Sequence, residues 1–175
     1  MKNRYPLFRI FLMVLFLLFC WARPVVFAGE EEAFAWAEEP DPSRPQPEQV
    51  VETGSDLWYG SSSQAGFLVS FDGGLTWETR NEGLPRKLLA GEEQLRTLTA
   101  IGVDPVQPQR VAVTTTKEIY LSEDSGATWR HIPFSNGSVI TAVALSPVNK
   151  EQLLVGTSFA GLYETTNAGR NWTKL

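Results

Sequence analysis

The octapeptide S-F-D-G-G-L-T-W at Ser70–Trp77 is repeated as S-E-D-S-G-A-T-W at Ser122–Trp129. A third and more divergent copy, T-T-N-A-G-R-N-W, occupies Thr165–Trp172. The first two copies share Ser, Asp, Gly, Thr and Trp at identical spacing. The tryptophans of successive copies are 52 and 43 residues apart, and self-similarity at such a period is typical of a repeat architecture.

The segments between the copies also repeat. Thr99–Pro105 aligns with Thr141–Pro147, and Arg110–Thr115 aligns with Gln152–Thr157. Each unit therefore contains four short segments of strand character, of which the last two flank the octapeptide. The first unit is harder to delimit, and its first strand is expected near Glu48–Val51.

Successive apolar residues at 111–113 and 119–121 predict strands that are buried on both faces of a sheet. Four-stranded sheets of this kind, repeating every 40–45 residues, describe the blades of a β-propeller. We therefore predict an all-β fold of about three four-stranded blades that form an incomplete propeller. No segment has a convincing helical period, although 88–95 is compatible with one short turn of helix.

The octapeptide has the chemistry of a hairpin turn. Asp72 or Asp124 can accept hydrogen bonds from backbone N–H groups two residues further on, and the following glycine can adopt a positive φ. The tryptophan then places a large ring between sheets. Asn167 retains an accepting oxygen, so the third copy is also expected to form the turn.

The octapeptide resembles the Asp-box, or BNR repeat, of the sialidase-like β-propeller superfamily, and the resemblance covers roughly residues 50–175. Proteins with this box include sialidases, some endo-acting glucanases, sortilin-type receptors and photosystem II assembly factors. The resemblance implies that the box is structural and lies away from the active face of the propeller. The residues to which this structural role is carried over are Ser70, Asp72, Gly74, Thr76, Trp77, Ser122, Asp124, Gly126, Thr128, Trp129, Asn167, Gly169 and Trp172.

No catalytic set accompanies these boxes. A sialidase would need clustered arginines, a tyrosine nucleophile with a glutamate partner, and an acid/base aspartate, and no motif places such residues here. His131 is the only histidine and is expected to be an ordinary strand residue. We predict no catalytic residue, no metal site, since no cluster has metal-ligand spacing, and no cofactor.

A candidate binding loop follows from the topology of a propeller. The turns between second and third strands share one rim with the connections between blades, and the longest such connection is the insertion at 82–95. Long loops on rigid scaffolds often carry function, although a merely solvated loop is the alternative. The candidate binding residues in this insertion are Arg86, Lys87, Leu88, Leu89, Glu92 and Glu93.

The N-terminus has the layout of a secretory signal peptide at residues 1–28. A positively charged start precedes the apolar run Ile10–Trp21, and Val26-Phe27-Ala28 is a small-x-small cleavage site. The sequence therefore predicts an extracytoplasmic protein, secreted or periplasmic, that begins at Gly29. The alternatives are an uncleaved N-terminal membrane anchor and a lipoprotein acylated at Cys20, the only cysteine.

An acidic, proline-rich linker is expected at residues 29–48, before the propeller segment at 49–175. The chain has a net charge of −5 although the leader is basic, so the remainder is more acidic still. The acidic balance and the lack of a basic patch disfavour nucleic acid as a partner.

These observations favour an exported, non-catalytic propeller module that binds or scaffolds an unidentified protein or glycan. The alternatives are a fragment of a glycan-active hydrolase, sialidase-like or endo-glucanase-like, and a truncated gene product. Three blades do not close a ring, because propellers typically have four to eight. We therefore expect the outer faces, including Phe67 or Leu68 at one end and Leu153, Leu154 or Tyr163 at the other, to be exposed. Such faces would be covered by self-association into a homo-oligomer or by further blades.

Overall fold

The computed structural model describes residues 44–89 and 91–175, so the predicted leader and most of the predicted linker lie outside the described residues. The described residues form β-strands and turns and contain no helix. Twelve strands build three four-stranded sheets, and two more form a separate hairpin.

Sheet 1 consists of β1 (Gln49–Glu52), β2 (Trp58–Ser62), β3 (Gly66–Ser70) and β4 (Glu78–Thr79). Sheet 2 consists of β7 (Ala100–Val103), β8 (Val111–Thr114), β9 (Ile119–Ser122) and β10 (Arg130–Ile132). Sheet 3 consists of β11 (Ile140–Leu145), β12 (Leu153–Thr157), β13 (Gly161–Thr165) and β14 (Thr173–Lys174).

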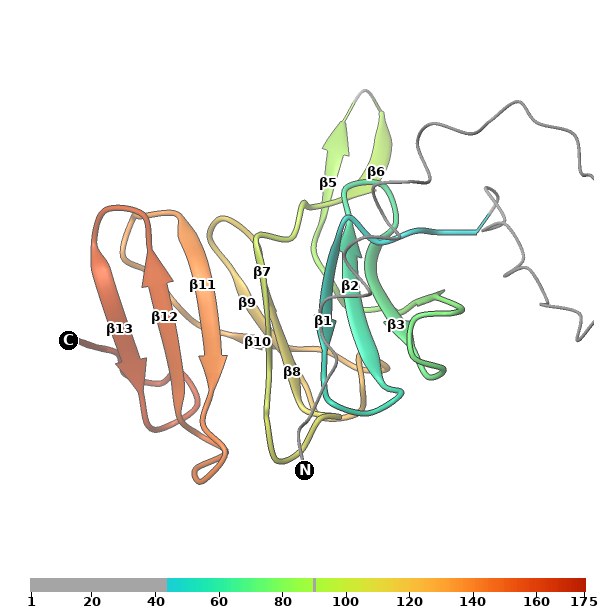
Figure 1. The fold of residues 1–175 in the computed structure, drawn as a ribbon. Coiled ribbons are helices and arrows are strands. Elements are labelled where there is room, and N and C mark those ends of the chain that lie inside the picture. The colour runs from blue at the N-terminus through green and yellow to red at the C-terminus, as the bar shows by residue number, and fades with distance from the viewer. Residues whose placement is uncertain (1–43, 90) are drawn as a thin grey trace, which may run out of the picture. The chain divides into compact units, whose positions relative to one another are not determined.

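Each sheet is an antiparallel meander in which strands adjacent in sequence are paired. The sheets stack face to face in chain order, with sheet 2 between sheets 1 and 3 (Figure 1). This is the architecture of three propeller blades that do not close into a ring, as the sequence predicts. The first strand of the first blade, β1, lies within one residue of its expected place at 48–51.

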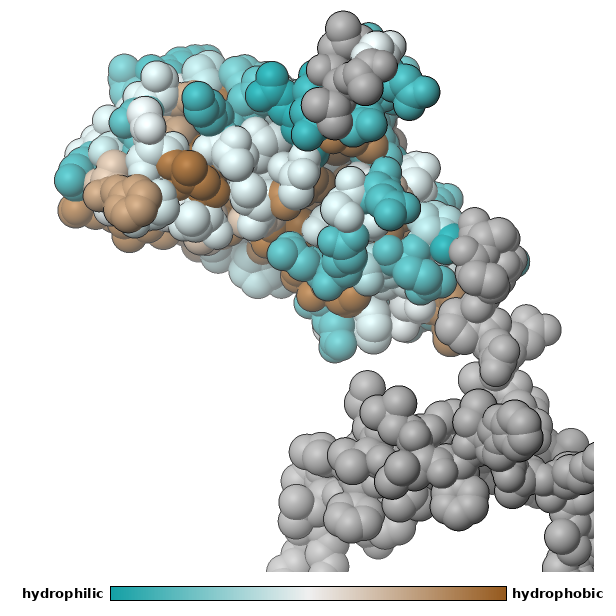
Figure 2. Space-filling model, turned by 90° about the horizontal axis from the view of Figure 1, so that it is seen from above, coloured by the Kyte–Doolittle hydropathy of each residue, from teal (hydrophilic) through white to brown (hydrophobic). Residues whose placement is uncertain are grey.

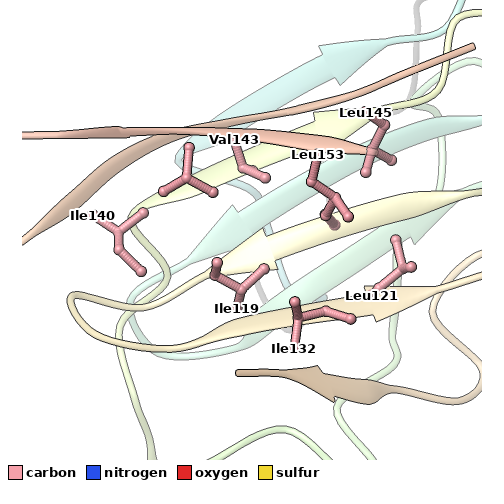
Figure 3. Close-up of a cluster of buried hydrophobic side chains, with 9 residues drawn as sticks. Ile119, Leu121, Ile132, Ile140, Val143, Leu145 and Leu153 are labelled. Atoms are coloured by element: carbon pink, nitrogen blue, oxygen red, sulfur yellow. The ribbon is translucent and has the colours of Figure 1, made fainter. Parts of the chain in front are cut away.

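The two interfaces between sheets hold the hydrophobic core. Tyr59, Phe67 and Val69 of sheet 1 pack against Val111 and Val113 of sheet 2. On the other side of sheet 2, side chains from sheets 2 and 3 point toward one another (Figure 3), namely Ile119, Leu121, Ile132, Ile140, Val143, Leu145 and Leu153. Every residue of β8 and β9 is buried, which confirms burial on both faces. Each fully buried aliphatic side chain contributes about 1.5–3 kcal/mol.

The prediction that Phe67 or Leu68 is exposed at the first end is wrong, and of the three alternatives at the other end Leu153 is excluded. Phe67, Leu68 and Leu153 are fully buried, at 0% exposure. Phe67 and Leu153 face sheet 2 and pack in its two interfaces. Leu68 lies on the outer face of sheet 1, where it pairs with Gly60. The side chains of Pro47 and Trp77 approach Gly60 closely and cover this part of the face.

Apolar residues remain exposed at sheet 3, as they do at Val50, Phe71 and Leu75 of sheet 1 and its turn. Leu162 and Leu175 are 41% and 63% exposed, while Leu154 and Tyr163 are half-buried. Glu164 occupies the position that Val69 and Leu121 hold in the first two sheets, as the strand registers show. The expectation that this face is covered by a second copy or by further blades stays a prediction.

The insertion folds as a β-hairpin and not as a turn of helix. β5 (Arg86–Leu89) and β6 (Glu92–Leu95) pair over four residues, and Gly91 lies in the turn between them. Gly91 in that turn has φ of 89°, a left-handed conformation that tight hairpin turns require. The turn chemistry of Gly91 outweighs the helix propensity of its leucine and glutamate neighbours. Within residues 44–89 and 91–175, no helix is long and apolar enough to cross a membrane.

Candidate functional site

The octapeptide turns are closed by hydrogen bonds among their own residues. In the first turn, Thr76 donates from its backbone N–H to Asp72 Oδ1 (2.9 Å) and from its hydroxyl to Asp72 Oδ2 (2.5 Å). Ser70 Oγ donates to Asp72 Oδ1 (2.7 Å) and accepts from the N–H of Gly74 (2.8 Å). Asp72 thus accepts from Thr76, four positions on, whereas the N–H of Gly74, which we expected to donate to Asp72, donates to the Ser70 hydroxyl.

The second and third turns repeat this network. Asp124 accepts from the N–H and hydroxyl of Thr128 at 2.8 and 2.6 Å. In the third turn, Asn167 Oδ1 accepts from the N–H of Asn171 (2.9 Å), so the amide replaces the carboxylate as an acceptor. The prediction that the divergent copy still turns is confirmed.

These bonds keep the aspartates ionised. Hydrogen bonds from the Thr76 hydroxyl and N–H, and then from Ser70, lower the pKa of Asp72 to about 2. For Asp124, burial raises the pKa, but the bonds from Thr128 and Ser122 outweigh it and lower the pKa overall. A carboxylate with a lowered pKa is a poor general acid near neutral pH, which supports a structural role for both residues.

Two of the three octapeptide tryptophans join one sheet to the next. The Trp129 ring packs edge-on against Phe67 (4.9 Å between centroids), and its Nε1–H donates to the carbonyl of Arg80 (3.0 Å). Trp172 packs in the same way against Phe134 (4.9 Å) and donates to the carbonyl of Pro133 (2.7 Å). Trp77 lies on the outer face of sheet 1, against Gly60.

The opposite rim carries the candidate binding surface. The turns between β2 and β3, β8 and β9, and β12 and β13 lie at one end of the sheets, and the β5–β6 hairpin stands on that end above sheet 1 (Figure 1). We call this end the hairpin rim. Seen from above, hydrophilic residues lie around the hairpin, and hydrophobic residues are spread among hydrophilic ones over the rest of this face (Figure 2).

A cavity of about 400 Å³ lies between the hairpin and the turn of sheet 1. It has the size of a small ligand pocket. The cavity includes Arg86 and Glu93 from the predicted candidate loop; its other lining residues are Ser63, Gln64, Gln94 and Leu95. The structure thus brings Arg86 and Glu93 to one cavity, while Lys87 lines a second hollow with Arg96 and Glu92 is exposed elsewhere on the hairpin. The side chains of Leu88 and Leu89 lie outside the described part of the structure.

The base of the hairpin is fixed by residues that sequence reasoning missed. Asn81 accepts from the N–H of Phe67 at Oδ1 (2.8 Å) and donates from Nδ2 to the carbonyl of Ala65 (2.7 Å). A side chain at Gly66 would meet Asn81 Oδ1 at 2.5 Å and Leu95 Cδ1 at 2.6 Å, so the hairpin approaches this glycine closely. The sequence offered one signal for this close approach, the glycine at position 66. In the structure Gly66 has a φ of 78°.

Charges of both signs lie on the hairpin rim. Glu48 Oε1 accepts from the hydroxyl and N–H of Ser63, and these bonds lower the pKa of Glu48. Arg96, directly after β6, forms an ion pair with Glu118 (3.6 Å). His131 is exposed on β10, where its ring lies 5.3 Å from that of Tyr120. Among the described residues, no group of three or more His, Cys, Asp or Glu side chains could hold a metal ion.

Fold and turns together define a BNR-type β-propeller. A family model described as "Photosynthesis system II assembly factor YCF48" matches residues 55–175, and the chain belongs to this family.

Relatives and solved structures agree with the fold. A probable oligoxyloglucan-reducing end-specific xyloglucanase of Neosartorya fischeri is 29% identical over 124 residues, which cover 67% of this chain and 15% of that protein. YCF48 from Cyanidioschyzon merolae is 20% identical with a TM-score of 0.56, over 77% of this chain and 38% of that one. A structure of YCF48 bound to D1 peptide is 17% identical with a TM-score of 0.53, over 71% and 38% of the two chains. The chain thus spans much less than half the length of these proteins.

Proposed function

We propose that this chain is an exported, non-catalytic propeller module that binds an extended segment of a partner protein at the hairpin rim. The observation that carries the proposal is the cavity of about 400 Å³ between the hairpin and the sheet 1 turn. Family membership supports a role in protein assembly, and a YCF48 of similar fold has been solved with a D1 peptide bound.

The chemistry of the carboxylates supports the non-catalytic part of the proposal. Where burial or hydrogen bonding shifts the pKa of a described carboxylate, the pKa falls, as at Glu48, Asp72, Asp104 and Asp124. Glycoside hydrolysis by the ordinary route instead needs one carboxylic acid whose pKa is raised.

Titration of the full chain with a D1 peptide, followed by calorimetry, tests the binding function. We expect binding that Arg86→Glu weakens and that Val148→Ser leaves unchanged, because Val148 is 91% exposed on the opposite rim. Binding that responds equally to both variants, or no binding to any partner segment, would contradict the proposal.

A glycan-directed function is the second candidate, because the xyloglucanase relative is 29% identical. Incubation of the full chain with xyloglucan oligosaccharides distinguishes the two. Release of new reducing ends would establish the hydrolase alternative, and binding without release would indicate a glycan-binding module. A truncated product without function would bind neither peptide nor glycan.

Export rests on the leader alone, so it is tested separately. We expect N-terminal sequencing of the extracytoplasmic protein to begin at Gly29. Recovery of intact Met1 in the membrane fraction would indicate an uncleaved anchor, and an acylated Cys20 would indicate a lipoprotein.

A further inference from the structure

We propose that the free edge of β6 is the docking line of the hairpin rim, and that the partner binds there as an added antiparallel or parallel β-strand. The inference rests on the proposed peptide-binding function and names how the peptide is held.

The hydrogen-bond alternation of the hairpin decides which backbone groups are free. Arg96 N–H donates to the carbonyl of Pro85 (3.0 Å), which makes these two residues a hydrogen-bonded pair at the base of the hairpin. Hydrogen-bonded and non-hydrogen-bonded pairs alternate along an antiparallel ladder. Glu93 and Leu95 therefore direct their N–H and C=O groups away from β5.

The strand that carries these outward groups borders the cavity. Glu93, Gln94 and Leu95 are consecutive, and all three line it. Side chains of consecutive strand residues point to opposite faces, so three in a row around one cavity indicate that the edge of the strand, and not one face, borders it. Among the described residues, no backbone hydrogen bond joins the outward groups of Glu93 or Leu95 to another segment.

Most outer sheet edges are blunted, but the inner edge strands β1 and β7 pair without interruption over four residues, as β6 does, so β6 is set apart by the cavity that it borders. The outermost strands β4 and β14 have two residues each and β10 has three. The inner edge strand β11 has an irregular register between Ile140 and Ala142. Short edge strands and bulges are the usual means of preventing strand addition, whereas β6 pairs without interruption over four residues. An extended peptide adds readily to such an edge.

The surrounding charges select the peptide. Glu93 and Arg86 both line the cavity, on the side that faces the turn at 62–66. Opposite charges on neighbouring strands attract, and like charges repel. The bound segment is therefore an extended peptide without proline at its pairing positions, with a basic side chain beside Glu93 and an acidic side chain beside Arg86.

Hydrogen exchange on the full chain tests this arrangement. The probes are a D1 peptide and linear peptides selected from a displayed random library. We expect the amide protons of Glu93 and Leu95 to exchange quickly in the free protein and to become protected when peptide binds. Binding without protection of these amides would overturn the strand-addition proposal and leave the proposed function intact. If no peptide binds, the proposed function and this inference both fail.

Substitutions give an independent measure. Glu93→Pro removes an outward N–H and no hydrogen bond of the hairpin, so we expect peptide affinity to fall about tenfold or more. Glu93→Gln keeps the N–H and should lose much less. Retained protection of the Gln94 amide against exchange would show that the hairpin still forms in Glu93→Pro.

A second variant is used if Glu93→Pro unfolds the hairpin. Gln64→Trp fills the cavity from the side of the sheet 1 turn and should weaken peptide binding by a similar factor. Unchanged affinity in Gln64→Trp, or equal losses in Glu93→Pro and Glu93→Gln, would overturn the proposal.

Discussion

Asp124 uses both carboxylate oxygens to hold a single turn closed. Its partners are the hydroxyl and N–H of Thr128 and the hydroxyl of Ser122. The turn places Gly126 against the Phe67 ring of the preceding sheet, where an added Cβ would come within 2.5 Å. The local turn and the packing between sheets therefore depend on the same side chain.

Asp124→Ala is expected to lower the free energy of unfolding by about 1–2 kcal/mol, because it leaves turn donors without an acceptor in a partly solvated site. Urea denaturation midpoints measure this. Asn167→Asp is the matched control and should change stability little, since Asn167 already accepts the equivalent bond. Full stability of Asp124→Ala with loss of peptide binding would show that the turn is functional and not structural.

The lowered pKa of Asp72 gives stability a defined pH dependence. Its pKa is about 2 in the folded protein against an ordinary value of 3.8, so its contribution is present above pH 3.8 and is lost as the pH falls toward 2. In Asp72→Asn this loss is absent, and stability should fall less steeply between these pH values. Parallel acid-denaturation curves for the two proteins would contradict the assignment.

At the scale of elements, the hairpin is joined to sheet 1 through a glycine. Gly66 ends the turn of sheet 1, and Leu95 of β6 and Asn81 approach it too closely for a side chain. The neighbouring backbone groups are satisfied by Asn81 at Phe67 N–H and Ala65 carbonyl. The close contact of Leu95 with Gly66 joins β6 to sheet 1, and the Asn81 bonds fix the segment that leads into the hairpin.

Gly66→Ala should therefore destabilise the protein and displace the hairpin. The added methyl would lie 2.5 Å from Asn81 Oδ1, and alanine would be strained at φ of 78°. Gly54→Ala is a suitable control, because its φ is also positive, at 80°, but nothing lies within 4 Å of the added atom. Thermal melts should show the larger loss for Gly66→Ala, and peptide binding should weaken in this variant alone.

The sequence predicts the sheets well because their signals are local and repeated. Four-strand spacing, the octapeptide turns and the doubly apolar runs at 111–113 and 119–121 each follow from neighbouring residues. The hairpin was missed because leucine and glutamate suit a helix, and only Gly91 marks the turn. Asn81 and Gly66 were missed because their meaning depends on a contact between segments 14 residues apart. The sequence located the candidate binding loop at 82–95, but it did not predict the pairing of β5 with β6 or the cavity beside them.

At the scale of the whole molecule, Arg110 forms a buried ion pair within the β7–β8 turn of sheet 2 and connects this turn to sheet 3. Arg110 and Asp104 are each 2% exposed, with Nη1 and Oδ2 3.1 Å apart. Arg110 also donates to the carbonyls of Ser146 and Lys150, in the turn of sheet 3 between β11 and β12. Burial raises the pKa of Asp104, but the N–H groups of Val106 and Gln107 and the Arg110 guanidinium lower it overall.

Arg110→Met is expected to cost about 3–5 kcal/mol, because it leaves a buried carboxylate without its cation. Arg96→Met is the control. Its ion pair with Glu118 is 3.6 Å long, with side chains 44% and 30% exposed, so about 0–1 kcal/mol should be lost. Denaturant midpoints decide, and equal effects of the two substitutions would show that Arg110 does not connect the sheets.

The glycines of the octapeptide turns also have a consequence for how such chains grow by duplication. Gly126 leaves room for Phe67 of the preceding sheet, and Gly169 leaves room for Ile132. The matching pieces therefore belong to different blades. A duplication that copied one blade from its first strand to its fourth would separate each glycine from the side chain it accommodates. A duplication that began in the middle of one blade and ended in the middle of the next would keep both, so the unit that preserves this packing is offset from the visible blade.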